Sequence, residues 1–318
     1  KYLSKNIIIV GAGIAGLMCA QRLTKSGLSV SIFDKSRGVG GRIGTRRIEN
    51  GIFNHGASQI PNFRRQAKIP AFVKDYFEKA ISERIIVPDG KSFTAFSSMK
   101  TLTSDLSLGI DIKKEIEIVG LKNKKVGIEL LLGNNPHSLL HENILIFAIP
   151  QPQLVSLLKN DFQEISKLIE PAEMSASITG LFAFKEPLDQ IKGGLENNNI
   201  IAHHENSRLG QDLKLDCWTV HSKKVYGQNW CHLNKEEIKN RLLDDFKQLD
   251  FKNFSKPVYA AGHRWRYGFT KRSLNTDYIY DENNKIGVCG DWCKGNTVID
   301  AAISGVSLAE KILSFVIE

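Results

Sequence analysis

The sequence predicts an α/β protein, because a strand, a glycine loop, a helix, a second strand and an acidic residue follow one another in residues 7–34. Residues 7–10 are Ile-Ile-Ile-Val, an apolar β-branched run typical of a buried parallel strand. Glycines follow at positions 11, 13 and 16, and residues 14–25 carry the apolar spacing of a helix. A second apolar run, residues 29–33, ends at Asp34, which stands 23 positions after Gly11.

This order is the pattern of a dinucleotide-binding βαβ unit. The glycines allow a sharp turn, close approach of a pyrophosphate to the backbone and close helix–strand packing. The N-terminus of the helix faces the phosphates, and the acid accepts from a ribose hydroxyl. The alternative is a glycine-rich turn in another kind of α/β protein. The predicted cofactor loop consists of Gly11, Ala12, Gly13, Ile14, Ala15 and Gly16, with Asp34 beyond it.

Composition and charge indicate which kinds of partner the chain has. The chain has 318 residues, 42% of them hydrophobic and 24% charged, which is typical of a globular protein with about two domains. Lys and Arg exceed Asp and Glu by nine, but the excess is spread over short clusters and no nucleic-acid-binding motif is present. We therefore expect anionic small ligands and no nucleic-acid partner. No apolar run approaches the roughly 20 residues that span a bilayer, so no membrane partner is expected.

Cysteine usage predicts free thiols and no metal site. The five cysteines lack the paired spacing of a zinc site, so free thiols in the reducing cytoplasm are the prediction. They are Cys19, Cys217, Cys231, Cys289 and Cys293.

The remaining patterns predict a discontinuous cofactor domain and a second domain. We expect strands at 51–57, 111–118, 127–132, 143–150, 177–184, 217–221, 258–262 and 286–291, and helices within 60–85 and at 99–106, 235–249 and 297–315. The cofactor domain is predicted to comprise residues 1–60, 96–152 and 262–318. The substrate domain is predicted to comprise residues 61–95 and 153–261.

Several motifs together resemble a known family. They are the glycine loop, the segment Arg37-Gly38-Val39-Gly40-Gly41-Arg42 and the segment Cys289-Gly290-Asp291-Trp292, and this set resembles the flavin-dependent amine oxidases. Residues 263–267 and 146–153 resemble, more narrowly, renalase-type FAD oxidoreductases. The resemblance implies a Rossmann-type FAD-binding domain of the glutathione-reductase kind and an α+β substrate domain of the amine oxidase type.

The resemblance also implies how FAD is held without a covalent bond, with a link through Cys293 as the less favoured alternative. The first loop holds the pyrophosphate, and the helix beginning near Thr297 directs its N-terminus at the flavin. Beyond the first loop, the implied contacts are Lys35, Arg37, Gly40, Gly41, Arg42, His55, Gly56, Ala57, Gly290, Asp291, Thr297, Val298 and Ala301.

The chain departs from the family pattern at four positions. Thr297, Ile299 and Asp300 stand where an arginine, a glutamate and a glycine are usual, and His55 stands where an acid is common. Asp300 beside the flavin would disfavour an anionic reduced ring, unless it caps the helix. We interpret it as a cap.

The expected substrate contacts are aromatic and basic. Trp265, Arg266 and Tyr267 follow the apolar run 258–262 and precede a loop, and Trp218 lies on another strand with His221 on its opposite face. The alternative for Trp218 and His221 is a packed Trp and a hydrogen-bonded His. No catalytic residue is assigned beyond the flavin itself, and the candidates are Trp265, His221 and His55.

The resemblance to renalases implies an oxidase. It would take a hydride from an isomeric dihydronicotinamide dinucleotide (2- or 6-dihydro-NAD(P)) to flavin N5 and pass the electrons to O2, giving NAD(P)+ and H2O2. One alternative is a flavin-dependent amine oxidase or desaturase-like enzyme. An alternative of another class is a flavin-binding sensor or interaction protein without significant turnover.

Overall fold

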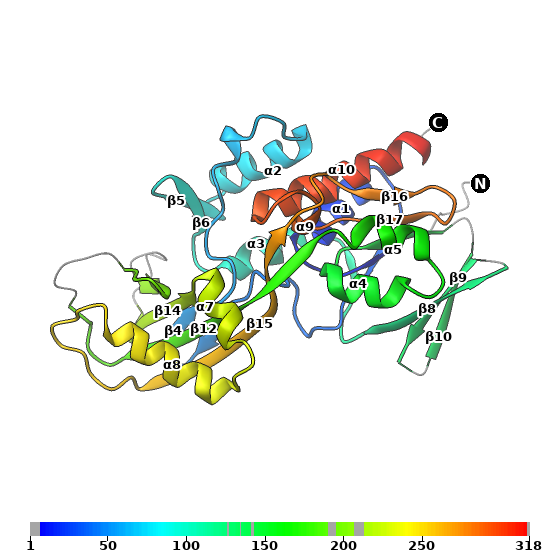
Figure 1. Cartoon of the computed structure of the whole chain (residues 1–318). Coiled ribbons are helices and arrows are strands. Elements are labelled where there is room, and N and C mark those ends of the chain that lie inside the picture. The colour runs from blue at the N-terminus through cyan, green and yellow to red at the C-terminus, as the bar shows by residue number, and fades with distance from the viewer. Residues whose placement is uncertain are drawn as a thin grey trace.

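The glycine loop follows a strand at the centre of a six-stranded sheet. Figure 1 shows the whole chain, with α1 (Ile14–Lys25) and α10 (Val298–Val316) side by side. The computed structural model describes residues 7–125, 127–133, 135–140, 143–189, 195–206 and 213–316. The strand order is β16-β17-β11-β1-β2-β7, and the pairs are parallel apart from β16 with β17. The strands are β1 (Ile7–Val10), β2 (Val30–Phe33), β7 (Asp111–Lys113), β11 (Ile144–Phe147), β16 (Ile279–Asp281) and β17 (Ile286–Val288).

Helices cover both faces of this sheet because its short strands are apolar on both sides. Alternate residues such as Ile9 face α1 and α10, while Ile8 and Val10 face α4 and α5. The helices α1 and α10 touch backbone to backbone, since a Cβ at Gly305 would lie 2.1 Å from the Ala15 carbonyl oxygen. The helices of this part are α1 (Ile14–Lys25), α2 (Ala71–Ser82), α3 (Met99–Leu106), α4 (Gln151–Leu158), α5 (Gln163–Ile169), α9 (Asp291–Lys294) and α10 (Val298–Val316).

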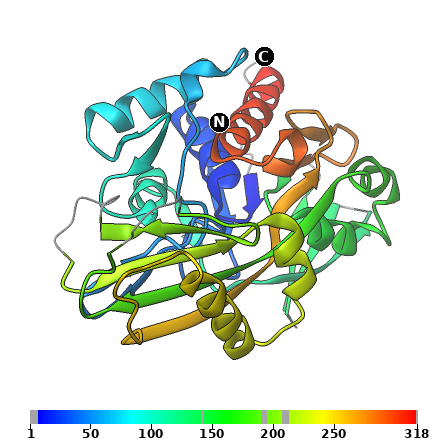
Figure 2. The ribbon, with the colours of Figure 1, turned by 60° about the vertical axis from the view of Figure 1, so that its left-hand side comes forward.

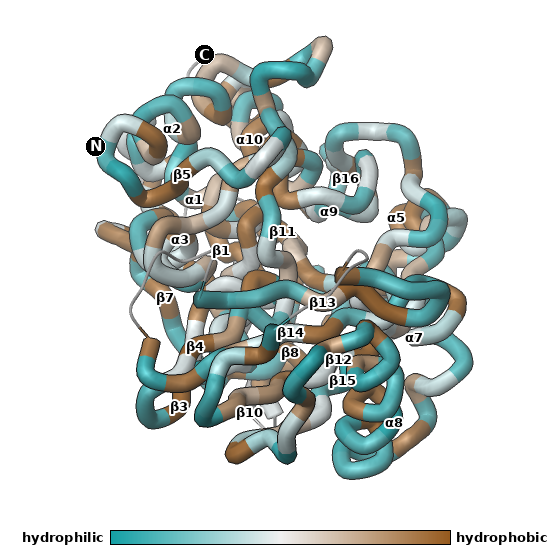
Figure 3. Tube along the Cα trace, turned by 90° about the vertical axis from the view of Figure 1, so that its left-hand side faces the viewer, coloured by the Kyte–Doolittle hydropathy of each residue, from teal (hydrophilic) through white to brown (hydrophobic). Residues whose placement is uncertain are grey.

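A four-stranded antiparallel sheet forms the second part, in the order β13-β14-β12-β15. Figure 2 shows it beside the parallel sheet, and Figure 3 shows α8 on its outer side with a mostly hydrophilic trace. Phe182 and Trp218 pack with Phe246 of α8 in its core. The elements are β12 (Glu173–Phe184), β13 (Ile200–His204), β14 (Asp216–Ser222), β15 (Tyr259–Arg272), α7 (Lys224–Trp230) and α8 (Lys235–Lys247).

Smaller elements connect the two parts. The hairpin of β3 and β4 lies against the second sheet, where Phe53 packs with Leu181 and Cys217. The remaining elements are β3 (Arg46–Ile48), β4 (Gly51–Phe53), the 3₁₀ turn Phe63–Arg65, the pair β5 (Ile86–Asp89) and β6 (Ser92–Ala95), and the sheet of β8 (Ile118–Lys124), β9 (Gly127–Leu132) and β10 (Asn135–Leu140).

Two predicted strands differ from the structure. The expected strand 111–118 is interrupted, because Glu115 adopts a left-handed φ of 59° between β7 and β8. The expected strand 258–262 is instead β15, which runs on to Arg272 along β12. Trp265 therefore lies within a strand, not after one.

The packing also places several segments differently from the predicted domains. Val73 and Phe77 of α2 share a core with α1, so residues 61–95 pack on the parallel sheet. Leu154 of α4 packs on the other face of the same sheet. Residues 262–272 belong to the antiparallel sheet through β15. The amphipathic helices have no sequence feature that says which of the two sheets they cover.

Candidate functional site

The glycine loop combines two tightly packed glycines with one that faces open space. A Cβ at Gly11 would lie 2.5 Å from the Ala148 carbonyl oxygen, and one at Gly16 would lie 2.0 Å from the Gly11 carbonyl oxygen. Gly13 differs, because a Cβ there meets no atom within 4 Å. Gly13 precedes α1, so the open space lies at the N-terminus of that helix. A phosphate is well matched to this position.

Asp34 is fixed beside the loop. Its Oδ2 accepts from the Ala12 N–H at 2.7 Å, and its Oδ1 accepts from the Ser36 N–H at 2.7 Å. A carboxylate offers about four acceptor positions, so each oxygen retains one for a ribose hydroxyl. The neighbouring Lys35 and Arg37 side chains are exposed, and Arg37 pairs only loosely with Glu115 at 3.9 Å.

Arg42 joins the second glycine cluster to the distant Gly-Asp segment. Its Nη1 donates to Asp291 Oδ2 at 3.0 Å, and its Nη2 donates to Asp291 Oδ1. The Thr270 hydroxyl donates to the same carboxylate at 3.1 Å. The Gly40 N–H donates to the Ala12 carbonyl at 2.8 Å, which ties the two glycine clusters together. Residues 249 positions apart in the sequence therefore share one site.

The first turn of α10 is closed by a reciprocal cap. The Asp300 N–H donates to Thr297 Oγ1 at 3.1 Å, and the Thr297 N–H donates to Asp300 Oδ2 at 2.9 Å. The interpretation of Asp300 as a helix cap is thus confirmed. Thr297 and Asp300 thus bond to each other. The first N–H groups of α10, which have no acceptor within the helix, begin at Val298.

A cluster of aromatic and imidazole rings faces the loop after β4. His263 and Trp265 stand on one face of β15, and the Trp265 indole N–H donates to the His55 carbonyl at 3.0 Å. The His55 ring stacks on Trp265 with centroids 5.2 Å apart and meets His263 edge-on at 4.9 Å. Gly44 makes room for this ring, since a Cβ there would lie 2.6 Å from His55 Cε1. We call His55, His263 and Trp265 the ring cluster.

The ring cluster is held uncharged at neutral pH. Burial lowers the pKa of His55 to about 4, and His263, Arg46 and His221 add to the effect. Burial likewise lowers the pKa of His263 to about 4, together with Arg46 and Lys235. The charges that act on both imidazoles are therefore cationic, an environment that disfavours a further cation.

We expect folding stability to fall as the pH drops from about 6.5 towards 4. Both imidazoles have a lower pKa in the folded chain than in the unfolded chain, so the unfolded chain binds more protons in that window. For His55 the full difference between the folded and the unfolded pKa corresponds to about 3 kcal/mol of folding free energy. Solvent screening makes the contribution of His263 smaller. Urea unfolding from pH 7.5 to 4.5 measures the effect, and a His55→Asn variant should flatten the curve. If the unfolding free energy of His55→Asn depends on pH as steeply as that of the wild type, His55 does not have the lowered pKa.

The other predicted substrate residues lie apart from the ring cluster or at its border. Trp218 is only 3% exposed in the core beneath α8, where its indole donates to Asp216, so its placement does not support substrate contact. His221 lies on the opposite face, as expected, with its Nδ1 3.2 Å from Thr179 Oγ1. Arg266 is exposed, and Tyr267 lies where β15 shifts its register against β12, between Trp265 and Phe269.

Gly56 and Ala57 connect the ring cluster to Arg42. The Ala57 N–H donates to the Arg42 carbonyl at 2.9 Å, and the Gly56 N–H donates to the Gly44 carbonyl at 3.3 Å. A Cβ at Gly56 would lie 2.0 Å from the Arg42 carbonyl oxygen, so only glycine allows this approach. Of the other predicted contacts, Gly290 precedes α9, and Ala301 lies in the first turns of α10.

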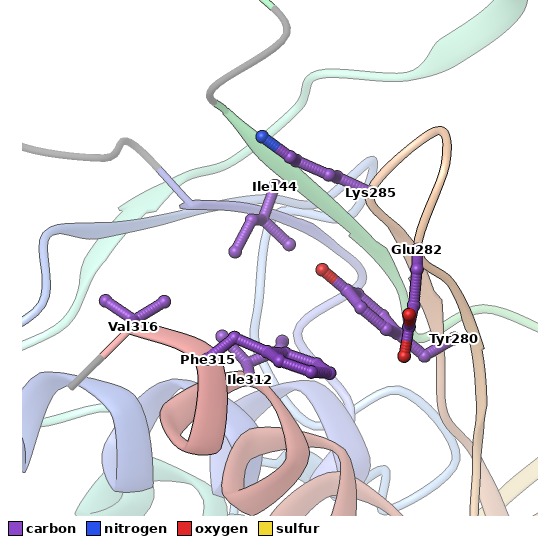
Figure 4. Close-up of a pocket in the computed structure, with 7 residues that line it drawn as sticks. All are labelled: Ile144, Tyr280, Glu282, Lys285, Ile312, Phe315 and Val316. Atoms are coloured by element: carbon purple, nitrogen blue, oxygen red, sulfur yellow. The ribbon is translucent and has the colours of Figure 1, made fainter. Parts of the chain in front are cut away.

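A separate pocket of about 170 Å³ lies at the other end of the parallel sheet (Figure 4). Ile144 at the start of β11 and Phe315 near the end of α10 line it, together with Lys285. Ligands of open α/β sheets bind at the carboxyl ends of the strands, where the glycine loop stands. The pocket therefore lies away from the dinucleotide position.

Sequence reasoning missed three polar residues near the ring cluster. Arg46 acts on both imidazoles, and the buried Glu205 accepts from the Asn54 N–H. The apolar run 258–262 marked the beginning of β15, but nothing in the sequence pairs position 54 with position 205.

Comparisons with known proteins agree with this geometry. A family model described as an NAD(P)-binding Rossmann-like domain matches residues 9–76. A 4,4'-diapophytoene desaturase of Staphylococcus haemolyticus is 30% identical over 112 residues, which are 35% of this chain and 19% of the desaturase. An L-amino-acid oxidase of Sistrurus catenatus edwardsii is 36% identical over 75 residues, which are 24% of this chain and 13% of the oxidase. The matches thus span under a fifth of these two relatives.

Solved structures match over nearly the full chain. Cyclohexylamine oxidase from Brevibacterium oxydans aligns with a TM-score of 0.69 at 11% identity, over 97% of this chain and 99% of that chain. Putrescine oxidase bound to putrescine aligns with a TM-score of 0.67 at 13% identity, over 98% and 99%. The chain therefore has the amine oxidase fold, a Rossmann-like dinucleotide-binding part joined to an antiparallel-sheet part.

Two features are absent from the described part of the chain. None of its helices combines the length and the apolar character that crossing a bilayer requires. None of its His, Cys, Asp and Glu side chains gather in threes as a metal ion would need. The cytoplasmic location stays a prediction from cysteine usage.

Proposed function

We propose that the chain is an FAD-dependent oxidoreductase, with a small substrate bound between the N-terminal end of α10 and the ring cluster. One observation carries the proposal: hydrogen bonds join Asp34 to Ala12, Ala12 to Gly40, Arg42 to Ala57 and His55 to Trp265, and short chain segments link these pairs into one series. A dinucleotide has its ribose at one end and its reactive ring at the other, so we assign the Asp34 end of the series to the ribose and the ring cluster to the reactive end. Bound FAD supplies the two-electron acceptor.

The chain's own residues fit the parts of FAD. The open space at Gly13 and the N-terminus of α1 suit the pyrophosphate, and Asp34 suits the adenosine ribose. Arg42 and Asp291 offer donors and acceptors for the ribityl chain and phosphate. The capped N-terminus of α10 offers a helix dipole that would stabilise negative charge on a reduced ring bound beside it. The mode of attachment is proposed as non-covalent, because Cys293 is fully buried.

Two substrate classes compete within this proposal. The matches to amino acid oxidases, amine oxidases and carotenoid desaturases support an amine or an apolar substrate. The cationic surroundings of the uncharged imidazoles support a neutral or anionic planar substrate, such as a dihydronicotinamide isomer. In either class, Trp265 and His55 would stack on the substrate and exclude water from it. O2 is the proposed electron acceptor.

Anaerobic bleaching of the bound flavin ranks these classes. The FAD-loaded chain is mixed with NADH, with the 2- and 6-dihydro isomers of NADH, and with putrescine and L-leucine, and loss of flavin absorbance is followed. Faster bleaching by an isomer than by NADH and the amines supports the dihydronicotinamide class. Fastest bleaching by an amine supports the amine oxidase class. A flavin that none of them reduces would exclude the dihydronicotinamides and these amines as substrates, and it would favour an apolar substrate or a binding protein without turnover.

We expect Trp265→Phe to retain FAD but to slow bleaching about tenfold. The substitution keeps a ring but removes the indole N–H that holds the His55 carbonyl, and misplaced groups slow a reaction steeply. Stopped-flow absorbance measures the rate with the fastest member of the panel. Trp230→Phe is the control, because Trp230 lies beside Arg241 on the α8 side of the sheet. Equal rates in the two variants would remove Trp265 from the substrate site.

A further inference from the structure

The buried carboxylate of Glu205 lies at the junction of the two sheets. It is 0% exposed and comes directly after β13 of the antiparallel sheet. Its Oε1 accepts from the Asn54 backbone N–H at 3.0 Å and from the Thr219 hydroxyl at 2.5 Å, and its Oε2 accepts from the Asn54 side-chain amide at 3.2 Å. A buried charge of this kind persists only where several donors compensate its lost hydration.

Asn54 also bonds to the first residue of α3. The Asn54 Oδ1 accepts from the Met99 backbone N–H at 2.9 Å and from the Thr45 hydroxyl at 2.9 Å. Asn54 itself is 1% exposed. Both polar atoms of the Asn54 side chain are thus used: Glu205 holds its backbone N–H and its amide nitrogen, and the start of α3 holds its amide oxygen.

The clamped residue immediately precedes His55. The His55 carbonyl accepts from the Trp265 indole, and its ring stacks on that indole. A buried polar network that is fully satisfied rigidifies the groups attached to it. The position of the ring cluster relative to the glycine loop therefore depends on the backbone at position 54.

We propose that Glu205 is a positioning residue, which fixes the segment Asn54–His55 and thereby holds His55 against Trp265 at the substrate position. Glu205 does not itself touch the substrate. The importance of this placement for turnover rests on the proposed function, but the placement can be measured without turnover.

The test measures the pKa of His55 by NMR in the full-length, FAD-treated chain carrying labelled histidine. The signal is assigned with His55→Asn, and the exposed His232 serves as an internal reference. In Glu205→Gln the segment should loosen and expose the imidazole, so its pKa should rise from about 4 towards 6.5, by about one unit or more. Loss of the negative charge alone would lower this pKa, so the two causes have opposite signs.

Matched variants separate placement from general destabilisation. Asp245→Asn alters another buried carboxylate of the same part, one that accepts from Tyr226 and Asn199, and should leave His55 unchanged. Thr219→Val removes one donor to Glu205 but keeps both Asn54 bonds, and should give a smaller rise. If Glu205→Gln does not fold, Thr219→Val decides.

An unchanged or lowered His55 pKa in Glu205→Gln, or in Thr219→Val where the former does not fold, would overturn the proposal. An equal rise in Asp245→Asn would also overturn it. These outcomes do not depend on flavin uptake. A wild-type chain that takes up no FAD would instead contradict the proposed function, and the His55 titration would still decide the role of Glu205.

Discussion

Gly13→Val is expected to abolish FAD retention while leaving the chain folded. Gly13 has a φ of −79°, which any L-residue adopts, and a Cβ there meets no protein atom within 4 Å. The cost to folding should stay near 1 kcal/mol, because only a helix N-cap preference changes. The added isopropyl group would instead occupy the space proposed for the pyrophosphate. We expect the Kd for FAD to rise at least about 100-fold, equivalent to about 2.8 kcal/mol.

Fluorescence titration of the flavin-free chain with FAD measures this change, and urea unfolding measures stability. Gly38→Val is the matched control, because Gly38 is exposed, also has open space around its Cα and lies outside the first loop. Gly11→Val provides the opposite case, since its φ of +109° and its contact with Ala148 should destabilise the fold itself. Tight FAD binding by a folded Gly13→Val chain would contradict the proposed position of the pyrophosphate.

Arg42→Ala is expected to lower both stability and FAD retention. The change leaves Asp291, whose side chain is 7% exposed, without its bidentate partner. Removing one member of a buried ion pair costs about 3–5 kcal/mol, and the partial exposure of Arg42 reduces this to about 2–3 kcal/mol. The loss should be smaller in the double variant Arg42→Ala with Asp291→Asn, because no buried charge then remains unpaired.

Urea unfolding and FAD titration of both variants measure the two effects. Arg22→Ala is the control, since Arg22 pairs with Glu310 across α1 and α10 at the surface and should cost under about 1 kcal/mol. If Arg42→Ala behaves as Arg22→Ala does in both measurements, the pair with Asp291 does not organise the cofactor site.

Much of the parallel sheet could be predicted from local sequence. Residues 7–10, 14–25 and 30–33 form the expected strand, helix and strand, because a buried apolar run and the glycines specify them without distant partners. The helix at 99–106 has its predicted bounds for the same reason. The cap formed by Asp300 could also be predicted, since its spacing from Thr297 is that of a capping box.

The long strand β15 could not be predicted from its own residues. The segment from His263 to Arg272 is rich in polar and basic side chains, so its sequence is typical of a loop. Its strand conformation comes from pairing with β12, which lies about 90 positions away. The same pairing places His263 beside Trp265 on one face and sends Arg266 to the other.

Long-range polar contacts account for most of what was missed at the site. Glu205 and Asn54 stand 151 positions apart, and neither lies in a glycine-rich or aromatic motif. The burial of Trp218 depends on α8 lying over β14, which the spacing within one strand cannot reveal. Local patterns therefore predicted the cofactor loop better than the substrate side.

Titration of the purified, flavin-free chain with FAD measures whether this chain is a flavoprotein. We expect the chain to take up one FAD per molecule and to acquire the visible absorption bands of a bound flavin. Gly38→Val should bind FAD equally well, and Gly13→Val should not bind it. A folded wild-type chain that stays colourless with excess FAD would show that the glycine loop does not hold this cofactor.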